Sequence, residues 1–144
     1  MNKKQVLIFY KPDQNHSSEL VIVNEGIAAG FPSPANDFKE TRISLDKTLI
    51  KNKEATFYAR VLGDSMIGAG LDDGDLLVID RSLSPENKKI AVCFIDGEFT
   101  VKRLKIEKNS IALLPENSKY QPIKVTDKND FMIWGMVTYV IKQL

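Results

Sequence analysis

The alternation of apolar and polar residues predicts a chain built from short strands. Residues 56–62 (TFYARVL) and 75–80 (DLLVID) are rich in the β-branched and aromatic side chains that strands favour. Residues 90–95 and 98–104 flank Asp96-Gly97, and an Asp-Gly pair between two apolar runs predicts a tight hairpin. Many short strands joined by turns predict a mainly β domain, either a sandwich or a partly open barrel.

Three further segments complete this pattern. Residues 111–114 (IALL) predict another strand, which a Pro-Glu-Asn-Ser turn follows. Residues 131–141 (FMIWGMVTYVI) alternate poorly, which favours a strand covered on both faces with a kink or bulge at Gly135. Residues 44–50 predict a short helix capped by Ser44.

The segment before Gly30 differs from the rest of the chain and is predicted to form a separate arm. Two apolar runs, at 6–10 and 20–23, are separated by a polar stretch, and two short strands without a third are not stable alone. We therefore expect the arm to be mobile or to pair against the main body. The following GIAAGFPSPAND has a linker composition, and such an extended segment can lie in a groove as a substrate strand does. The expected division is an arm at 1–29, a linker at 30–43 and a β-rich catalytic and dimerisation domain at 44–144.

Composition and charge exclude several classes of protein. The 144 residues are 43% hydrophobic, as in one globular domain, and 20 Lys plus Arg against 19 Asp plus Glu leave a net charge of +1. That balance argues against direct, sequence-specific DNA binding. No apolar run reaches the roughly 18 residues of a membrane helix, and no signal peptide is present, so we expect a cytoplasmic protein without membrane contact. The single cysteine, Cys93, excludes an internal disulfide and a thiolate metal cluster, and the single histidine, His16, excludes a two-histidine metal site. We expect no cofactor.

The segment with the clearest chemical potential is Gly63-Asp64-Ser65-Met66. It opens residues 63–74, which hold four glycines in twelve positions and must form a loop or tight turn. A serine there can project its hydroxyl from a fixed backbone while nearby N–H groups converge on an oxyanion. Serines are also common in turns for local hydrogen bonding, so the tetrapeptide by itself leaves both interpretations open.

A nucleophilic serine needs a base, and the sequence offers two candidates. His16 lies in a polar stretch that is typical of solvated surface. Lys102 lies in EFTVKRLKI, where alternation places Thr100, Lys102 and Leu104 on one face. Burial there would lower the lysine pKa from about 10.4 towards the range of a general base. The alternative is an outward lysine on an amphipathic strand, because lysine is rarely buried.

Two other groups have simpler interpretations. Asp72, Asp73 and Asp75 lack the spacing and the closing glutamate of a calcium loop, so a turn leading into a strand is expected. Cys93, inside AVCFI, is expected to be a small buried hydrophobic residue.

Four blocks in order resemble the UmuD-type proteins of the LexA-like family of self-cleaving serine/lysine proteins. The blocks are AAGFPSPANDFKE, GDSMIGAGLDDGDLLVID, DGEFTVKRL and ALLPENSKYQPI, and the resemblance extends from Gly26 to the end of the chain. GFPSPA points to the UmuD type rather than to LexA. Because few residues precede Gly30, we expect no winged DNA-binding module of the kind that LexA has.

The resemblance implies an activity and a fold. It implies a LexA- and signal-peptidase-like β-barrel or sandwich with Ser65 as nucleophile, Lys102 as general base and Ala29-Gly30 as the bond cut. Cysteine precedes this glycine in UmuD-type proteins and alanine does so in LexA, so Ala29 departs from the UmuD pattern. The backbone N–H groups of Asp64 and Ser65 are the implied oxyanion donors.

The resemblance also implies partners in the SOS response to DNA damage. A RecA–single-stranded DNA filament would stimulate cleavage, and the product would act as a homodimer with a UmuC-type Y-family DNA polymerase in translesion synthesis.

Three other classes of function stay open. They are a non-catalytic dimeric adaptor of such a polymerase, a repressor domain without its DNA-binding part, and a signal-peptidase-like enzyme. The last would need a membrane anchor.

Overall fold

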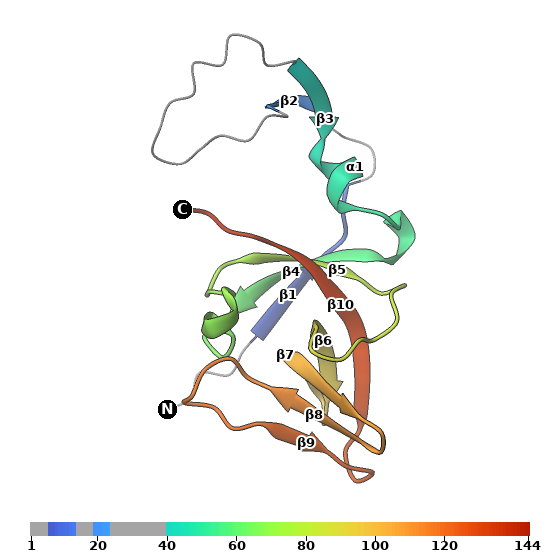
Figure 1. Ribbon diagram of the computed structural model, residues 1–144, viewed down its shortest axis with the longest axis vertical. Coiled ribbons are helices and arrows are strands. Elements are labelled where there is room, and N and C mark those ends of the chain that lie inside the picture. The colour runs from blue at the N-terminus through green and yellow to red at the C-terminus, as the bar shows by residue number, and fades with distance from the viewer. Residues whose placement is uncertain (1–5, 14–18, 24–39) are drawn as a thin grey trace. The chain divides into compact units, whose positions relative to one another are not determined.

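The computed structural model describes residues 6–13, 19–23 and 40–144 (Figure 1). His16 and the expected cleavage site at Ala29 and Gly30 lie outside these residues. The chain forms two compact units, a larger one from residues 1–12 and 52–144 and a smaller one from residues 13–51.

The larger unit is one eight-stranded antiparallel sheet that curls into a half-barrel (Figure 1). The order of its strands across the sheet is β1-β4-β5-β10-β6-β7-β8-β9. The mainly β fold predicted from the alternation is therefore confirmed, and of the two predicted forms, a sandwich or a partly open barrel, the structure has the second. The strands are β1 (Val6–Tyr10), β4 (Thr56–Leu62), β5 (Leu76–Asp80), β6 (Ile90–Ile95), β7 (Glu98–Glu107), β8 (Ser110–Leu114), β9 (Ile123–Val125) and β10 (Phe131–Ile141), with short 3-10 turns η1 (Lys53–Ala55) and η2 (Ile67–Ala69).

The β6–β7 hairpin forms at the predicted Asp-Gly turn. Asp96 and Gly97 both have positive φ angles, 49° and 86°, as the primed two-residue hairpin turn requires. The turn sets the register of the pair, in which Ala91 lies opposite Lys102 and Cys93 opposite Thr100. Lys102 therefore shares a face of the sheet with two small, buried apolar residues.

Two clusters of buried apolar side chains form the core. One cluster comprises Ala59, Val61, Met66, Leu71, Leu77, Ile79, Val92 and Val101. The other comprises Ala91, Cys93, Leu104, Leu113 and Met136. Cys93 has no exposed surface, which confirms its predicted packing role. Because Met66 immediately follows Ser65, burial of its side chain anchors the start of the loop that carries the serine.

Strand β10 contains the predicted bulge, but it is not covered on both faces throughout. The register shifts between Ile133 and Gly135, and a Cβ atom at Gly135 would lie 2.6 Å from Ile79 Cγ2. The end of the strand, however, has exposed fractions of 41–43% at Tyr139, Val140 and Ile141. Beyond Met136 the strand pairs with β5 alone and has left β6, so the expected double cover is wrong for this part.

The smaller unit is a two-stranded antiparallel sheet followed by a helical turn. Strands β2 (Glu19–Val23) and β3 (Glu40–Ser44) pair, and α1 (Leu45–Leu49) follows directly. Ser44 Oγ accepts a hydrogen bond from Lys47 N at 3.4 Å, which confirms the predicted N-cap. Strand β3, at the end of the expected linker, was not predicted.

Candidate active site

Ser65 lies in the loop between β4 and β5, and its own loop closes around it. The residue is 2% exposed. Gly63 N donates to Asp73 Oδ1 at 2.8 Å, and Gly74 N donates to Val61 O at 2.6 Å. These hydrogen bonds join the two ends of the loop, so the loop that carries the serine is closed at its base.

A second loop, residues 115–120 (PENSKY), clamps the serine turn through its backbone. Glu116 N donates to Ser65 O at 2.9 Å, and Gly68 N donates to Glu116 O at 2.7 Å. A Cβ atom at Gly68 would lie 2.5 Å from that same carbonyl oxygen, so only glycine fits this approach. We call residues 115–120 the clamp loop.

The clamp loop also holds Asp64 with two side chains. Asn117 Nδ2 donates to Asp64 O at 2.9 Å, and the Tyr120 hydroxyl donates to the Asp64 carboxylate. The C=O of Asp64 and the N–H of Ser65 belong to one planar, trans peptide and point in opposite directions. The bond from Asn117 therefore fixes the direction of the Ser65 N–H, one of the two expected oxyanion donors.

Lys102 projects from β7 into the interior, next to Ser65. It is 5% exposed, so the alternative of an outward lysine is wrong. Its Nζ lies 2.9 Å from Ser65 Oγ, 2.6 Å from Thr100 Oγ1 and 3.1 Å from Val101 O. The structure thus brings together the two residues that the sequence singled out as nucleophile and base.

Burial makes Lys102 easier to deprotonate. Loss of hydration lowers the pKa of its ammonium from 10.5 to about 8. The nearby Cys93 thiol opposes this shift when ionised, but burial raises the pKa of Cys93 to about 12, so the thiol is neutral near pH 8. At pH 7 the neutral fraction of Lys102 is then roughly a tenth, about 300 times that of a lysine with pKa 10.5.

The three oxygen atoms around Lys102 Nζ suit both protonation states. An ammonium donates to Ser65 Oγ, Thr100 Oγ1 and Val101 O. A neutral amine can still donate to Thr100 Oγ1 and Val101 O while its lone pair accepts the hydrogen of the Ser65 hydroxyl. The site can therefore pass a proton from serine to lysine without rearranging.

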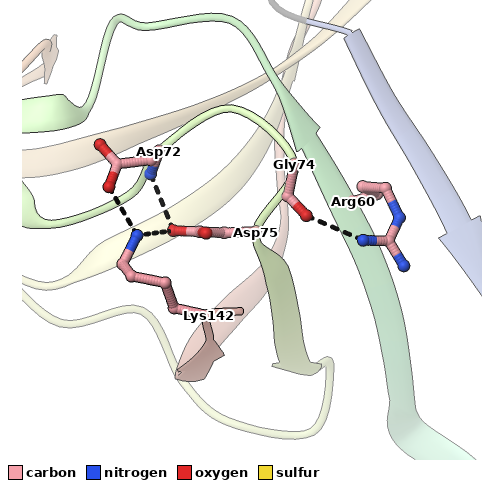
Figure 2. A network of polar contacts seen from close by, with 5 residues as sticks. All are labelled: Arg60, Asp72, Gly74, Asp75 and Lys142. Carbon is pink, nitrogen blue, oxygen red and sulfur yellow. Dashed lines mark hydrogen bonds and ion pairs between the residues drawn. The ribbon is translucent and has the colours of Figure 1, made fainter. Parts of the chain in front are cut away.

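The aspartates at the end of the serine loop tie it to its surroundings. Lys142 Nζ bonds Asp72 Oδ2 at 2.6 Å and Asp75 Oδ2 at 2.5 Å, and Arg60 Nη1 donates to Gly74 O at 2.8 Å (Figure 2). Hydrogen bonds to these carboxylates raise the pKa of Lys142. The expected turn into a strand is confirmed, since Asp75 directly precedes β5.

Thr100, Asn117 and Tyr120 lie at the site, but no sequence pattern predicts a role for them. The signal in the sequence for the last two is the block ALLPENSKYQPI, whose pattern predicts a strand and a turn. Nothing in that block indicates that it folds against Gly63-Asp64-Ser65, a segment that lies much earlier in the chain.

The described part of the chain contains neither a metal-binding cluster nor a membrane helix. Among residues 6–13, 19–23 and 40–144, no group of three or more His, Cys, Asp or Glu side chains is placed to hold a metal ion. In the same ranges, no helix is long and apolar enough to cross a membrane.

Comparison with known proteins identifies the family. The family model for "Peptidase S24-like" proteins matches residues 21–138. Protein SamA of Salmonella typhimurium is 40% identical over 137 residues, which cover 94% of this chain and 95% of that protein. Protein ImpA of Escherichia coli is 42% identical over 113 residues, 78% of this chain and 77% of that protein. The LexA repressor of Alcanivorax borkumensis is 42% identical over 107 residues, 74% of this chain and 52% of that protein. The LexA-like resemblance is confirmed, and the chain belongs to the peptidase S24-like family.

Proposed function

We propose that the chain is a self-cleaving serine peptidase that cuts its own Ala29-Gly30 bond, with Ser65 as nucleophile and Lys102 as general base. Membership of the peptidase S24-like family supports a self-cleaving serine peptidase in general. The observation that carries the assignment is the buried amine of Lys102, 2.9 Å from the Ser65 hydroxyl and with a lowered pKa.

The reaction follows acyl-transfer chemistry. Neutral Lys102 takes the Ser65 hydroxyl proton while Oγ forms a bond to the carbonyl carbon of Ala29. The carbonyl electron pair moves to oxygen, and the N–H groups of Asp64 and Ser65 stabilise that oxyanion. When the intermediate collapses, the bond to Gly30 N breaks and Lys102 returns the proton to that nitrogen. Water, deprotonated by Lys102, then hydrolyses the ester and restores Ser65.

The proposed substrate segment belongs to this protein itself, and the cut takes place either within one chain or between the two chains of a dimer. Residues 24–39, which contain Ala29 and Gly30, connect β2 to β3. Small residues on both sides of the bond suit a narrow approach to a serine that is 2% exposed. Cleavage would divide the chain into the proposed arm, 1–29, and a product that begins at Gly30 and comprises the linker at 30–43 and the domain at 44–144.

The biological part of the proposal is a role in the SOS response. A RecA–single-stranded DNA filament would stimulate cleavage in the cytoplasm, and the product would form a homodimer that serves a UmuC-type Y-family polymerase. Similarity to SamA, ImpA and the LexA repressor supports this assignment. A non-catalytic adaptor of the same polymerase is the competing outcome of the test below.

The test is intact mass over several hours at about pH 10, where a lysine with pKa about 8 is neutral. We expect a fragment ending at Ala29 and a product beginning at Gly30. Ser65→Ala and Lys102→Ala should stay whole. Lys105→Ala is the matched control, since Lys105 lies on the same strand with its side chain 55% exposed, and it should be cut like wild type. A wild-type chain that stays whole at pH 10, and also with activated RecA filament, would support the adaptor instead.

A further inference from the structure

We propose that β1 is a non-covalent anchor that keeps the arm, residues 1–29, bound to the rest of the larger unit after the chain is cut. We call that remainder, residues 52–144, the body. Cleavage and release of the arm are then separate steps. The site that β1 fills is then a strand-acceptor surface on the edge of β4, and its occupant is the chain's own arm. This inference rests on the proposed function only for the position of the cut.

The backbone pairing of β1 is complete along its length. Every residue of the strand pairs antiparallel with β4, from Val6 opposite Leu62 to Tyr10 opposite Tyr58. Strand β5 occupies the other edge of β4, so β1 is the terminal strand of the sheet at this side (Figure 1). Loss of β1 would leave a row of unpaired N–H and C=O groups along β4, which is the usual template for strand addition.

The side chains of β1 alternate between the core and solvent. Ile8 and Tyr10 are 42% and 46% exposed, whereas Leu7 and Phe9 pack against the larger apolar cluster. The Phe9 ring lies 5.0 Å from Phe99 and 4.7 Å from Trp134, measured between ring centroids. Phe9 is therefore the side chain that inserts the arm into the body.

A third contact holds the chain just after β1. Lys11 Nζ lies 4.7 Å from the centroid of the Phe57 ring and donates to Glu54 O at 3.2 Å. Lys11 is exposed, so this contact adds less than Phe9 does.

The proposed cut leaves all of these contacts in place. Strand β1 ends at Tyr10, far ahead of Ala29 and Gly30 in the chain. Hydrolysis removes only the covalent tether, which converts an intramolecular contact into a bimolecular one.

Among the described residues, two strand pairings join the segments before and after the proposed cut, and the pairing of β1 with β4 is the stronger. Strand β2 also belongs to the arm and pairs with β3, but that sheet has two strands only, and an isolated two-stranded sheet is marginal in water. Release of the arm is then set by the contacts of β1 with β4, Phe99 and Trp134. Departure of the arm exposes those two rings and the β4 edge to another extended apolar segment.

The test makes the cut without the proposed active site. A recognition sequence for a site-specific protease is placed after Ala29 in the Ser65→Ala chain, the chain is cut, and the products are examined by native mass spectrometry and size exclusion. We expect the two fragments to travel together as a 1:1 complex at micromolar concentration. Fragments that separate at once, with the body still folded, would overturn the proposal. Because an added protease makes the cut, this result does not depend on self-cleavage.

A matched pair of variants tests the anchor itself. Phe9→Ala should weaken retention of the cut arm at least tenfold, which corresponds to about 1.4 kcal/mol. Ile8→Ala, on the exposed face of the same strand, should change it less than about threefold. In the uncut chain, Phe9→Ala should also speed amide hydrogen exchange along β4, a readout that needs no cut. Equal effects of the two variants on both measurements would contradict the proposal.

Discussion

Lys102 is the residue on which the proposed chemistry depends. A lysine in water is almost wholly protonated at pH 7 and cannot accept a proton from serine. Here, burial opposite Ala91 removes hydration from the ammonium and lowers its pKa to about 8. Burial therefore destabilises the ammonium form of Lys102 and favours the neutral amine, which is the proposed base. Two expected dependences on pH follow from this.

The first expectation concerns the rate of self-cleavage. Since the neutral form of Lys102 is the proposed base, the first-order rate should rise about tenfold per pH unit below pH 8 and level off by about pH 9. Single-turnover cleavage followed by intact mass between pH 6 and 10 measures this profile. A rate that keeps rising to pH 10.5 would show that the lysine is hydrated during the reaction.

The second expectation concerns stability. The pKa of Lys102 is lower in the folded than in the unfolded chain, so between about pH 8 and 10.5 the unfolded chain binds more protons and stability rises with pH. Relative to a Lys102→Met variant, wild type should gain about 3 kcal/mol of unfolding free energy across that window. Urea unfolding at pH 7 and 10.5 provides the comparison, with both proteins carrying Ser65→Ala so that neither is cut during the measurement. No change in their difference would contradict a buried ammonium.

The clamp loop shows how one segment can position another. Residues 115–120 contribute a backbone pair and two side chains, Asn117 and Tyr120, to the turn that carries Ser65. The backbone pair reaches Ser65 and Gly68, and both side chains reach Asp64. Glu116 of the clamp loop also accepts from Arg103 Nε at 2.5 Å, next to Lys102 on β7. Asn117 and Tyr120 thus act on the serine turn, whereas Glu116 also ties the loop to the strand of the proposed base.

Asn117→Ala should therefore slow cleavage without moving its pH midpoint. Loss of one hydrogen bond of ordinary strength predicts a rate lower by roughly two- to tenfold. The midpoint should stay near pH 8, because the burial of Lys102 is unchanged. Asn87→Ala is a suitable control, since its Oδ1 accepts from Ile106 N and lies outside the clamp. A shifted midpoint in Asn117→Ala would mean that the residue acts through the lysine.

The bulge in β10 offers a separate test of packing. Gly135→Ala would bring a methyl group to within 2.6 Å of Ile79 Cγ2 and 3.1 Å of Arg81 Cγ, in a crowded part of the core. Overpacking of this kind predicts a loss of about 1–3 kcal/mol of unfolding free energy. Urea unfolding measures the change, and an unchanged midpoint would show that the bulge can relax.

Long-range polar contacts join distant parts of the larger unit to the loop that carries Ser65. Lys142, near the end of the chain, bonds Asp72 and Asp75 in the loop that starts at Gly63 (Figure 2). Asp75 is 5% exposed, so removing its partner leaves a nearly buried carboxylate without its ion pair.

Lys142→Ala should consequently lower both the melting temperature and the cleavage rate. Lys105→Ala removes an exposed pair at 3.4 Å from Glu107 and should change neither. Differential scanning calorimetry and the mass assay at pH 9 give the two readouts. If Lys142→Ala matches Lys105→Ala, the network does not hold the loop.

Local patterns were enough to predict several parts of this molecule. The Asp96-Gly97 hairpin, the Ser44 cap and the bulge at Gly135 each follow from the conformational preferences of neighbouring residues, and each is present. For Ser65 and Lys102 the local patterns left a structural serine and an outward lysine open, and it was the resemblance to the LexA-like family that implied their roles.

Other parts depended on contacts between residues far apart in the chain. Alternation placed Lys102 on a face of a strand, but only the curl of the sheet decided that this face is dry and lies beside Ser65. The roles of Asn117 and Tyr120 could not be predicted, because their partner, Asp64, belongs to a distant part of the sequence. The apolar run at 6–10 predicts a strand but does not indicate which strand it pairs with. In the structure its partner is the edge of β4. The preference of a segment for strand structure depends on its own residues, whereas its burial and its pairing partner depend on the fold of the whole chain.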